Sequence, residues 1–398
     1  MEIKVNVNIS IDIAEPSLKC ILKAFVKTIT PYFQKVVIQV IEYFATAYLG
    51  NGILRKMLKA RTIHKKSFTG RNTTKITTPF GLIKLPQYQV TIDGKKRRNI
   101  TRLLLGIEKW KRIPLITEKY LGLLGALAPL RVVNKFASLF CGRKFSLMAI
   151  VRAMRNSAKK VKLGIDEKEQ HVFEADGTGI PILRSGKRGR ELKVLAQRKQ
   201  NGGIRIAGMD IGTYEKGGWE RLFEPLKKIM RKFKEIFLVT DGDTSLLDGL
   251  KGITVILQRC LFHIAHELKY TLWEDGVKRK SEAWQTALAR TLEITMVKRI
   301  REEAAVCDKV IAAKKQKLKD LIIWCEAQGF EKTTTFLKNA SGDIFSGIER
   351  RIGGGTTSLI ERVMRTVNQR INVAKWSEES ALAVAVLRGA YYYNGYDV

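Results

Sequence analysis

The hydrophobic pattern between residues 166 and 270 predicts strands alternating with helices. Five short apolar runs predict strands at 172–176, 191–199, 203–210, 236–240 and 253–257. Gln200, Asn201 and Gly202 form a strong hairpin signal between the second and third of these strands. Helices are predicted at 219–234 and from residue 260 onward. The order indicates an α/β layer with an antiparallel edge and a parallel part.

The chain after residue 270 is predicted to be helical. Charged, alanine-rich periodic stretches such as 296–328 indicate an all-helical insertion at 271–350. Gly353, Gly354 and Gly355 then provide a hinge before two further helices, at 356–372 and 381–393. The last of these is apolar and is expected to cover the core. We therefore divide the core into a first part at 166–270 and a last part at 351–398, on either side of the insertion.

Three further segments are predicted before residue 166. Residues 1–50 form an N-terminal helical arm, and residues 51–115 form a basic β-hairpin segment with strands at 75–79 and 82–92. Residues 116–165 are helical. Predicted helices at 131–140 and 146–160, with Ser146 as the N-cap of the second, have the spacing of a helix-turn-helix. Many helical hairpins share this spacing, so DNA recognition and simple packing are both compatible with it.

The net charge of the chain indicates a polyanionic partner. The formal net charge is +34 and the pI is near 10, which favours nucleic-acid binding. Residues 51–112 alone hold 17 lysines and arginines against two acidic residues. A basic hairpin can follow a phosphate backbone without reading base sequence. The candidate DNA-binding residues lie in a basic turn and around the second helix: Lys95, Lys96, Arg97, Arg98, Arg143, Lys144, Arg152 and Arg155. A solvated charged surface is the alternative.

Cysteine usage and hydropathy limit the other classes. The five cysteines contain no C-x-x-C pair, so neither a disulfide framework nor a four-cysteine zinc site is expected. The early apolar run at 36–49 is too short and too polar to span a bilayer, and no signal peptide is expected. We therefore predict no membrane association and a reducing compartment.

Three carboxylates are the candidate catalytic and metal-binding residues: Asp176, Asp241 and Glu361. Both aspartates follow apolar runs and precede glycine, which lets a polar ligand approach the backbone. Carboxylates are the hard oxygen ligands that divalent cations prefer. Asp243 is an alternative to Asp241, and Glu349 and Glu378 are alternatives to Glu361. Each aspartate could also be an ordinary turn residue, and a lone glutamate on a helix is usually solvated.

The spacing of these acids resembles the aspartate–aspartate–glutamate site of RNase H-like transposases and integrases. Cys260-x-x-His263 resembles the C-x-x-H signature of the Mutator-like superfamily and its prokaryotic insertion-sequence relatives. The run from Thr357 to Arg365, with Trp376 and Ser377 downstream, resembles the region around that group's catalytic glutamate. The resemblance covers residues 170–390 well and reaches residues 76–84 more loosely.

This resemblance implies an RNase H-like core and a DNA transposase that cleaves transposon ends and transfers the strand to target DNA. Asp176 would bridge two Mg²⁺ ions, with Mn²⁺ as a substitute, while Asp241 and Glu361 would each hold one ion. Cys260, His263, Asp243 and Arg365 would support the site or contact DNA. The implied partners are double-stranded DNA, in terminal inverted repeats and target, and further copies of the chain. The implied location is the nucleoid-associated cytoplasm of a prokaryote.

Three alternatives remain open on the sequence. Another RNase H-like nuclease, such as a junction resolvase, would use the same acids. A domesticated transposase would bind DNA without cleaving it, and a structural basic protein would need only the charge. Cys260, His263 and His266 could be zinc ligands, although no fourth cysteine or histidine lies nearby. Cys260 and His263 could also form a packed core pair.

Overall fold

The computed structural model describes residues 24, 27–40, 63–67, 73–78, 81–87, 89–92, 96–99, 101–102, 107, 113–141, 144–183, 190–212, 218–243, 245–297, 304–352 and 356–396. The chain forms two compact units, Met1–Lys160 with the last residue and Val161–Asp397. Residues 27–40 are helical, and the rest of the predicted N-terminal arm, apart from residue 24, lies outside the described residues. None of the helices in these ranges is long and apolar enough to cross a membrane.

Short antiparallel strands form two sheets in the N-terminal unit. Strands β1 (Ile63–Ser67), β4 (Gln89–Ile92) and β5 (Lys96–Asn99) pair in the order β1-β4-β5. Strands β2 (Thr73–Thr78) and β3 (Gly81–Pro86) form a hairpin. The prediction of one strand over 82–92 was wrong, because Pro86 has no N–H to extend the ladder and β3 ends there.

The predicted basic turn is also corrected. Lys96, Arg97 and Arg98 belong to β5 and pair with β4, where Ile92 lies opposite Lys96. Lys95 and the two residues before it lie outside the described residues.

Three helices complete the described N-terminal unit: α4 (Leu115–Leu127), α5 (Leu130–Phe140) and α6 (Leu147–Ala158). Ser146 is the N-cap of α6, as predicted, and its Oγ accepts a hydrogen bond from the backbone N–H of Ala149 at 3.1 Å. Helix α6 buries Ile150, Ala153 and Met154. The opposite face carries Arg152 and also the exposed Met148, so it is only partly polar.

A close approach between α4 and α6 depends on Gly122. A Cβ atom added there would lie 2.5 Å from the Ser157 Oγ and 2.7 Å from the backbone oxygen of Ala153. We therefore expect Gly122→Ala to lower the free energy of unfolding by about 1–3 kcal/mol, because the helices must move apart. Urea unfolding would measure the change. Gly164→Ala, where no atom lies within 4 Å of the added Cβ, is the control.

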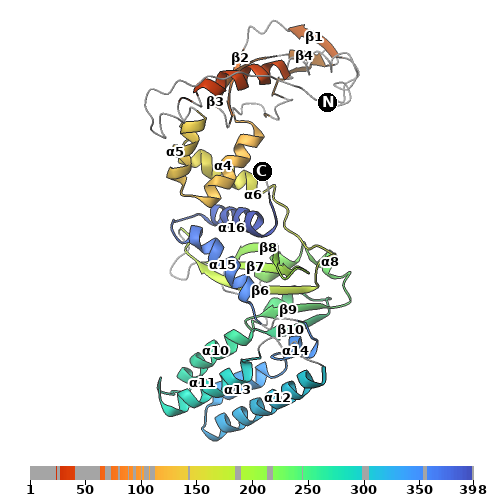
Figure 1. Cartoon of the computed structure of the whole chain (residues 1–398), viewed down its shortest axis with the longest axis vertical. Coiled ribbons are helices and arrows are strands. Elements are labelled where there is room, and N and C mark those ends of the chain that lie inside the picture. Colours follow the sequence, from red (N-terminus) through yellow and green to blue (C-terminus); the bar gives the residue numbers. More distant parts are fainter. Residues whose placement is uncertain are drawn as a thin grey trace. The chain divides into compact units, whose positions relative to one another are not determined.

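A mixed five-stranded sheet forms the centre of the C-terminal unit, as predicted (Figure 1). Its strands are β6 (Val172–Ile180), β7 (Arg190–Arg198), β8 (Ile204–Gly212), β9 (Ile236–Thr240) and β10 (Val255–Arg259). They lie in the order β10-β9-β6-β7-β8. Strands β6, β7 and β8 pair antiparallel, whereas β9 and β10 run parallel to β6.

Several predicted boundaries in this unit were wrong. Strand β10 was predicted at 253–257 and spans Val255–Arg259. Strand β6 continues past Asp176 to Ile180, because its antiparallel pairing with β7 extends to Ile180 opposite Arg190. The predicted helix at 219–234 is two short helices, α7 (Gly218–Phe223) and α8 (Lys227–Met230). Pro225 lies between them and cannot donate the backbone hydrogen bond that a continuous helix needs.

The two faces of the sheet are covered by different helices. Helices α7, α8 and α9 (Ser245–Gly249) cover one face, where Phe173, Leu195 and Leu238 share a buried cluster with Phe223 and Leu246. Helices α15 (Ser358–Ile371) and α16 (Glu378–Tyr393) lie across the other face in Figure 1. Both helices correspond to predicted ones, with α16 beginning three residues earlier than expected.

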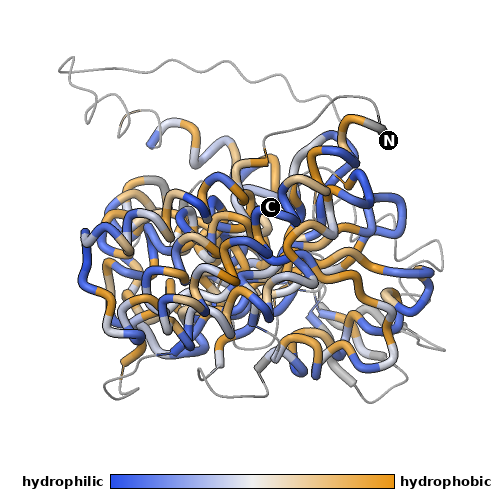
Figure 2. The backbone as a smooth tube through the Cα atoms, turned by 90° about the horizontal axis from the view of Figure 1, so that it is seen from below, coloured by the Kyte–Doolittle hydropathy of each residue, from blue (hydrophilic) through white to orange (hydrophobic). Residues whose placement is uncertain are grey.

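The described secondary structure of the predicted insertion is all helical. It follows α10 (Leu261–Glu274) and contains α11 (Glu282–Thr295), α12 (Ala304–Ala327), α13 (Glu331–Ala340) and α14 (Ser346–Glu349). These helices have a core of their own, which includes Leu268, Trp284, Leu321 and Leu337. Figure 2 shows hydrophobic and hydrophilic positions alternating along the described backbone. The side chain of Gln258, on β10, donates to the Ile344 carbonyl and accepts from the Gly347 N–H, which joins the insertion to the sheet.

Candidate active site

The strand register places the two candidate aspartates on neighbouring strands at the same level. The parallel pairing of β6 with β9 ends where Glu174 lies opposite Val239. Asp176 and Asp241 each follow two residues later, so they continue the same register on the same face of the sheet. Pairing of β9 with β10 ends at Thr240 opposite Arg259, and Cys260 follows directly after β10, as Asp241 follows β9.

Helix α15 brings Glu361 to this face. The backbone N–H of Ile360 donates to the Glu174 carboxylate on β6 at 3.0 Å, and the Asn368 amide donates to the Thr178 hydroxyl at 3.1 Å. These two contacts hold the helix along the strand that carries Asp176. The Glu361 side chain is half-buried, and its Oε1 lies 3.4 Å from the Thr357 hydroxyl.

The three acids interact electrostatically. The pKa of Asp176 is raised to about 7, mainly by burial and then by the negative charges of Asp241 and, more weakly, Glu361, while His263 acts in the opposite direction. A like charge lowers the tendency of a carboxyl group to ionise. The sheet and α15 thus gather three acids into one cluster with excess negative charge.

Cys260 and His263 connect this cluster to α15. The Cys260 sulfur accepts hydrogen bonds from the backbone N–H and the hydroxyl of Thr357, both at 3.3 Å. Burial acts to raise the pKa of Cys260, but hydrogen bonds with His263 and Thr357 outweigh it and lower the pKa. The nearby sulfur is also the main reason that the pKa of His263 rises to about 9, with Asp176 and Asp241 contributing. His263 is therefore a cation beside the carboxylates at neutral pH.

The C-x-x-H motif has a local structural basis. Cys260 is the N-cap of α10, and His263 lies in the first turn of that helix. The Nδ1 atom of His263 is buried and has no hydrogen-bond partner among the described residues. His266 is one turn further on, exposed, with its Nδ1 3.4 Å from the Glu267 carboxylate. The motif thus brings Cys260 and His263, but not His266, to the acidic cluster.

The alternative acids have other partners. Asp243 accepts hydrogen bonds from the Ser245 N–H at 2.8 Å, the Ser245 hydroxyl at 2.7 Å and the Trp219 indole at 3.3 Å. Its carboxylate therefore stabilises the loop after β9. Glu349 forms an ion pair with Lys315, and Glu378 lies 3.5 Å from Arg190. These contacts favour Asp241 and Glu361 as the acids of the site.

Two further acids, which the sequence analysis missed, lie at the site. Glu174 is fully buried and accepts a hydrogen bond from the Arg198 guanidinium at 2.7 Å. Glu191, on β7, lies directly against Gly177, where an added Cβ would come within 2.0 Å of its Oε1. Glu174 could have been found from the sequence, because it is an acid within an apolar strand and lies on the same face as Asp176, two residues later. Buried charges of this kind need a partner elsewhere in the chain.

A lysine balances part of this negative charge. The side chain of Lys193 is 3% exposed, and its Nζ lies 3.3 Å from Glu191 and 5.1 Å from the centre of the Trp219 ring. The pKa of Glu191 is raised, mainly by burial and also by the charges of Asp243 and Asp241. The ion pair with Lys193 acts in the opposite direction. Residues on the α7 side of the sheet thus adjoin the acidic cluster as well.

The remaining predicted site residues are more dispersed. Arg365 is exposed on α15, and Lys144 and Arg152 are exposed at and within α6. Arg155 is half-buried in the last turn of α6. Only the backbone of Lys96, Arg97 and Arg98 is described, while Lys95 and Arg143 lie outside the described residues. The basic residues before residue 160 and the acidic cluster belong to different compact units.

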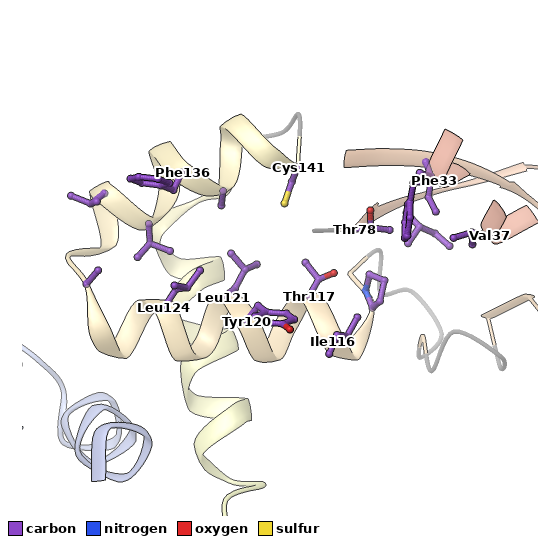
Figure 3. A pocket seen from close by; sticks show the side chains of 17 residues that line it. Phe33, Val37, Thr78, Ile116, Thr117, Tyr120, Leu121, Leu124, Phe136 and Cys141 are labelled. Carbon is purple, nitrogen blue, oxygen red and sulfur yellow. The ribbon is translucent and has the colours of Figure 1, made fainter. Parts of the chain in front are cut away.

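An apolar pocket of about 790 Å³ lies in the N-terminal unit (Figure 3). Phe33 and Val37 line it at one end, and Leu124 on α4 and Phe136 on α5 line it at the other. Its described lining has no acidic or basic side chain. Burial raises the pKa of Cys141, at its edge, to about 11, so that thiol stays protonated. This pocket can therefore bind apolar groups, and its described lining holds no carboxylate, imidazole or amine.

The donor set of the acidic cluster is that of a hard divalent cation, although its side chains do not form a closed cage. Asp176, Asp241 and Glu361 supply carboxylate oxygens, which suit Mg²⁺ and Mn²⁺. Among the described residues, no three histidine, cysteine, aspartate or glutamate side chains are gathered as a metal-binding group. Excess negative charge around Asp176 nevertheless favours a cation there.

The raised pKa of Asp176 has a consequence for stability. Its ordinary value is 3.8 and its folded value is about 7, so the folded state binds the extra proton between these pH values. The free energy of unfolding in metal-free buffer should therefore fall as pH rises through this window. We expect Asp176→Asn to be more stable than wild type at pH 8, by on the order of 2 kcal/mol, and equal to it below pH 4.

Thermal unfolding in EDTA at several pH values measures this difference. Asp248→Asn, which alters an acid of α9 paired with Lys251 at 3.4 Å, is the control and should show no such pH dependence. A stability difference for Asp176→Asn that stayed constant from pH 4 to 8 would contradict the prediction.

Comparison with known proteins adds no assignment to this geometry. No protein-family model matches the chain, and no curated protein matches its sequence.

Proposed function

We propose that the chain is a DNA transposase of the aspartate–aspartate–glutamate type, with an RNase H-like core. The observation that carries this proposal is the electrostatic cluster of Asp176, Asp241 and Glu361 on one face of a mixed sheet. An all-helical insertion between β10 and α15 and a C-x-x-H motif at the start of α10 support the same proposal. The net charge of +34 fits a DNA substrate.

In the proposed reaction, Asp176, Asp241 and Glu361 hold two Mg²⁺ ions, with Mn²⁺ as a substitute. Bound ions of this kind activate the attacking oxygen and stabilise the leaving oxygen in phosphodiester hydrolysis and strand transfer. The chain's own residues orient these acids: Glu174 holds the N-terminus of α15, and Thr357 links it to Cys260. Protonated His263 places a positive charge beside the acids and could pair with a phosphate oxygen.

Basic residues before residue 160 are proposed to hold double-stranded DNA along its backbone. Lys144 and Arg152 are exposed, as phosphate contacts require. Such contacts position a duplex without selecting its sequence, so the terminal inverted repeats and the target DNA can share them. Transposases act on two ends together, and we propose that the chain works as a homo-oligomer in the prokaryotic cytoplasm, in association with the nucleoid.

The test is a cleavage and strand-transfer assay on purified full-length protein. One substrate is linear DNA that carries the terminal sequences from either side of the gene. The other is a supercoiled target plasmid. Wild type is expected to nick the ends and join them to the plasmid in Mg²⁺, and to do neither in EDTA. Asp176→Ala should bind the same DNA and yield no product. Nicking without joining would instead favour an RNase H-like nuclease or resolvase.

A second candidate is a domesticated transposase that binds DNA without cleaving it. One observation favours it: the described acidic side chains do not gather into a closed metal-binding group. This candidate predicts tight, salt-dependent DNA binding that is equal in Mg²⁺ and EDTA. It also predicts no cleavage product from either wild type or Asp176→Ala. Isothermal titration of the protein with Mg²⁺ or Mn²⁺ separates the two candidates further. A catalytic transposase should bind the metal ion and lose that binding with Asp176→Ala, whereas a transposase that only binds DNA should show no such loss.

A further inference from the structure

Helix α10 has a row of exposed aromatic rings that begins beside the acidic cluster. Phe262, Tyr270 and Trp273 are 62%, 55% and 71% exposed, and His266 is also exposed. At about 100° per residue, these four side chains lie within an arc of about 80° on the helix. Lys269, also exposed, lies on the same side. We call Phe262, His266, Lys269, Tyr270 and Trp273 the α10 aromatic row.

The composition of the row differs from that of a core-facing surface. All the leucines and the isoleucine of α10 are buried: Leu261, Ile264, Leu268 and Leu272. The exposed apolar side chains of the helix are therefore all rings. A protein interface usually combines aromatic with aliphatic side chains, whereas unpaired bases stack on aromatic rings in particular. His266 and Tyr270 already contact each other edge to face, with ring centres 5.3 Å apart.

The two ends of the row suit a nucleic-acid strand. At the N-terminal end, Phe262 adjoins His263, whose ring centre lies 5.8 Å from that of Phe262. Beyond the C-terminal end, three successive exposed basic residues form a turn: Lys278, Arg279 and Lys280. Rings between a catalytic site and a basic turn can stack bases while cations contact phosphates.

We propose that the α10 aromatic row binds the single-stranded DNA that adjoins the scissile phosphate. This proposal rests on the proposed function and adds to it the location of an unpaired strand. Phe262 and Trp273 are 11 residues apart, about 16 Å along the helix. That length matches about five stacked nucleotides at about 3.4 Å each. The strand leaves the acidic cluster along α10 and reaches the basic turn.

The experiment measures binding of labelled single-stranded oligothymidine and of a duplex of equal length to the full chain by fluorescence anisotropy in EDTA. Trp273→Ala and Tyr270→Ala should each weaken single-strand binding about 5- to 100-fold and leave duplex binding unchanged. Trp273→Phe should keep most of the single-strand affinity. Tyr391→Ala, which removes an exposed ring from α16, is the matched control and should leave both affinities unchanged.

Several outcomes would overturn the proposal. If Trp273→Ala weakens neither DNA form, or weakens both equally, the row does not bind a single strand. If single-strand binding is unchanged and Trp273→Ala converts an oligomer into a monomer in sedimentation analysis, the row is an interface between copies. Because the measurement uses no metal and no cleavage, its result is independent of whether wild type cleaves DNA.

Discussion

Glu361→Gln is expected to lower the rate of Mg²⁺-dependent DNA cleavage by about 10³-fold or more, which corresponds to about 4 kcal/mol of transition-state stabilisation. Glutamine keeps the size of the side chain and its hydrogen bond with Thr357 but removes the negative charge. Glu361 is half-buried on the α15 face that meets β6, and its charge reaches Asp176. Loss of that charge removes one of the three carboxylates proposed to hold the metal ions. Single-turnover cleavage of a labelled DNA end at saturating protein measures the rate.

The two other candidate glutamates serve as matched controls for this substitution. Glu349→Gln and Glu378→Gln each break a surface ion pair, with Lys315 and with Arg190. Both should retain the wild-type cleavage rate, because such pairs contribute little to stability and lie outside the acidic cluster. Titration of duplex binding for all three variants separates a loss of chemistry from a loss of DNA affinity. A large rate loss for Glu349→Gln or Glu378→Gln, with Glu361→Gln active, would assign the third acid elsewhere.

Arg198→Met should lower the free energy of unfolding by about 3–5 kcal/mol. Glu174 is fully buried, and Arg198 is its charged partner at 2.6 Å. Burial raises the pKa of Glu174, and Arg198 is the main group that lowers it again. Removing the guanidinium leaves a carboxylate in the core with only backbone donors. Arg198 also donates to the Thr356 carbonyl at 3.1 Å, so the start of α15 loses a second contact.

Urea unfolding followed by circular dichroism measures this loss, and two further variants interpret it. The double variant Glu174→Gln, Arg198→Met should recover much of the stability, because a neutral amide can still accept the hydrogen bond from Ile360. Arg190→Met removes a half-exposed arginine, 3.5 Å from Glu378, and should cost less than about 1 kcal/mol. Equal losses for Arg198→Met and Arg190→Met would show that the buried pair does not stabilise the start of α15.

Much of the sheet could be predicted from local patterns. The apolar run at 236–240 matches β9 residue for residue, and the hairpin at Gly202 joins β7 and β8, with a backbone φ of 80° that glycine adopts readily. The order of strands and helices could be predicted because the spacing of hydrophobic residues changes between that of a strand and that of a helix. The extent of β6 did not follow, because Asp176 and Gly177 interrupt the apolar run while backbone pairing with β7 continues.

Local patterns also could not locate the supports of the candidate site. The Glu174 carboxylate and the Ile360 N–H are 186 residues apart, and the Cys260 sulfur and the Thr357 hydroxyl are 97 residues apart. Hydropathy periodicity reports which face of an element is buried but not which distant residue meets it. A charged residue such as Glu174 in an apolar strand indicates that a partner exists without identifying it.

The sequence by itself determined the alternation of apolar and polar positions, the cap at Ser146 and the basic excess, since each depends on residues close together in the chain. Only the tertiary structure decided that Asp176 and Asp241 share a register, that α15 brings Glu361 to their face, and that rings line the exposed side of α10. These relations depend on strand pairing and helix packing between distant segments. Their physical basis is the burial of apolar faces and of paired charges, which can be satisfied only after the chain has folded.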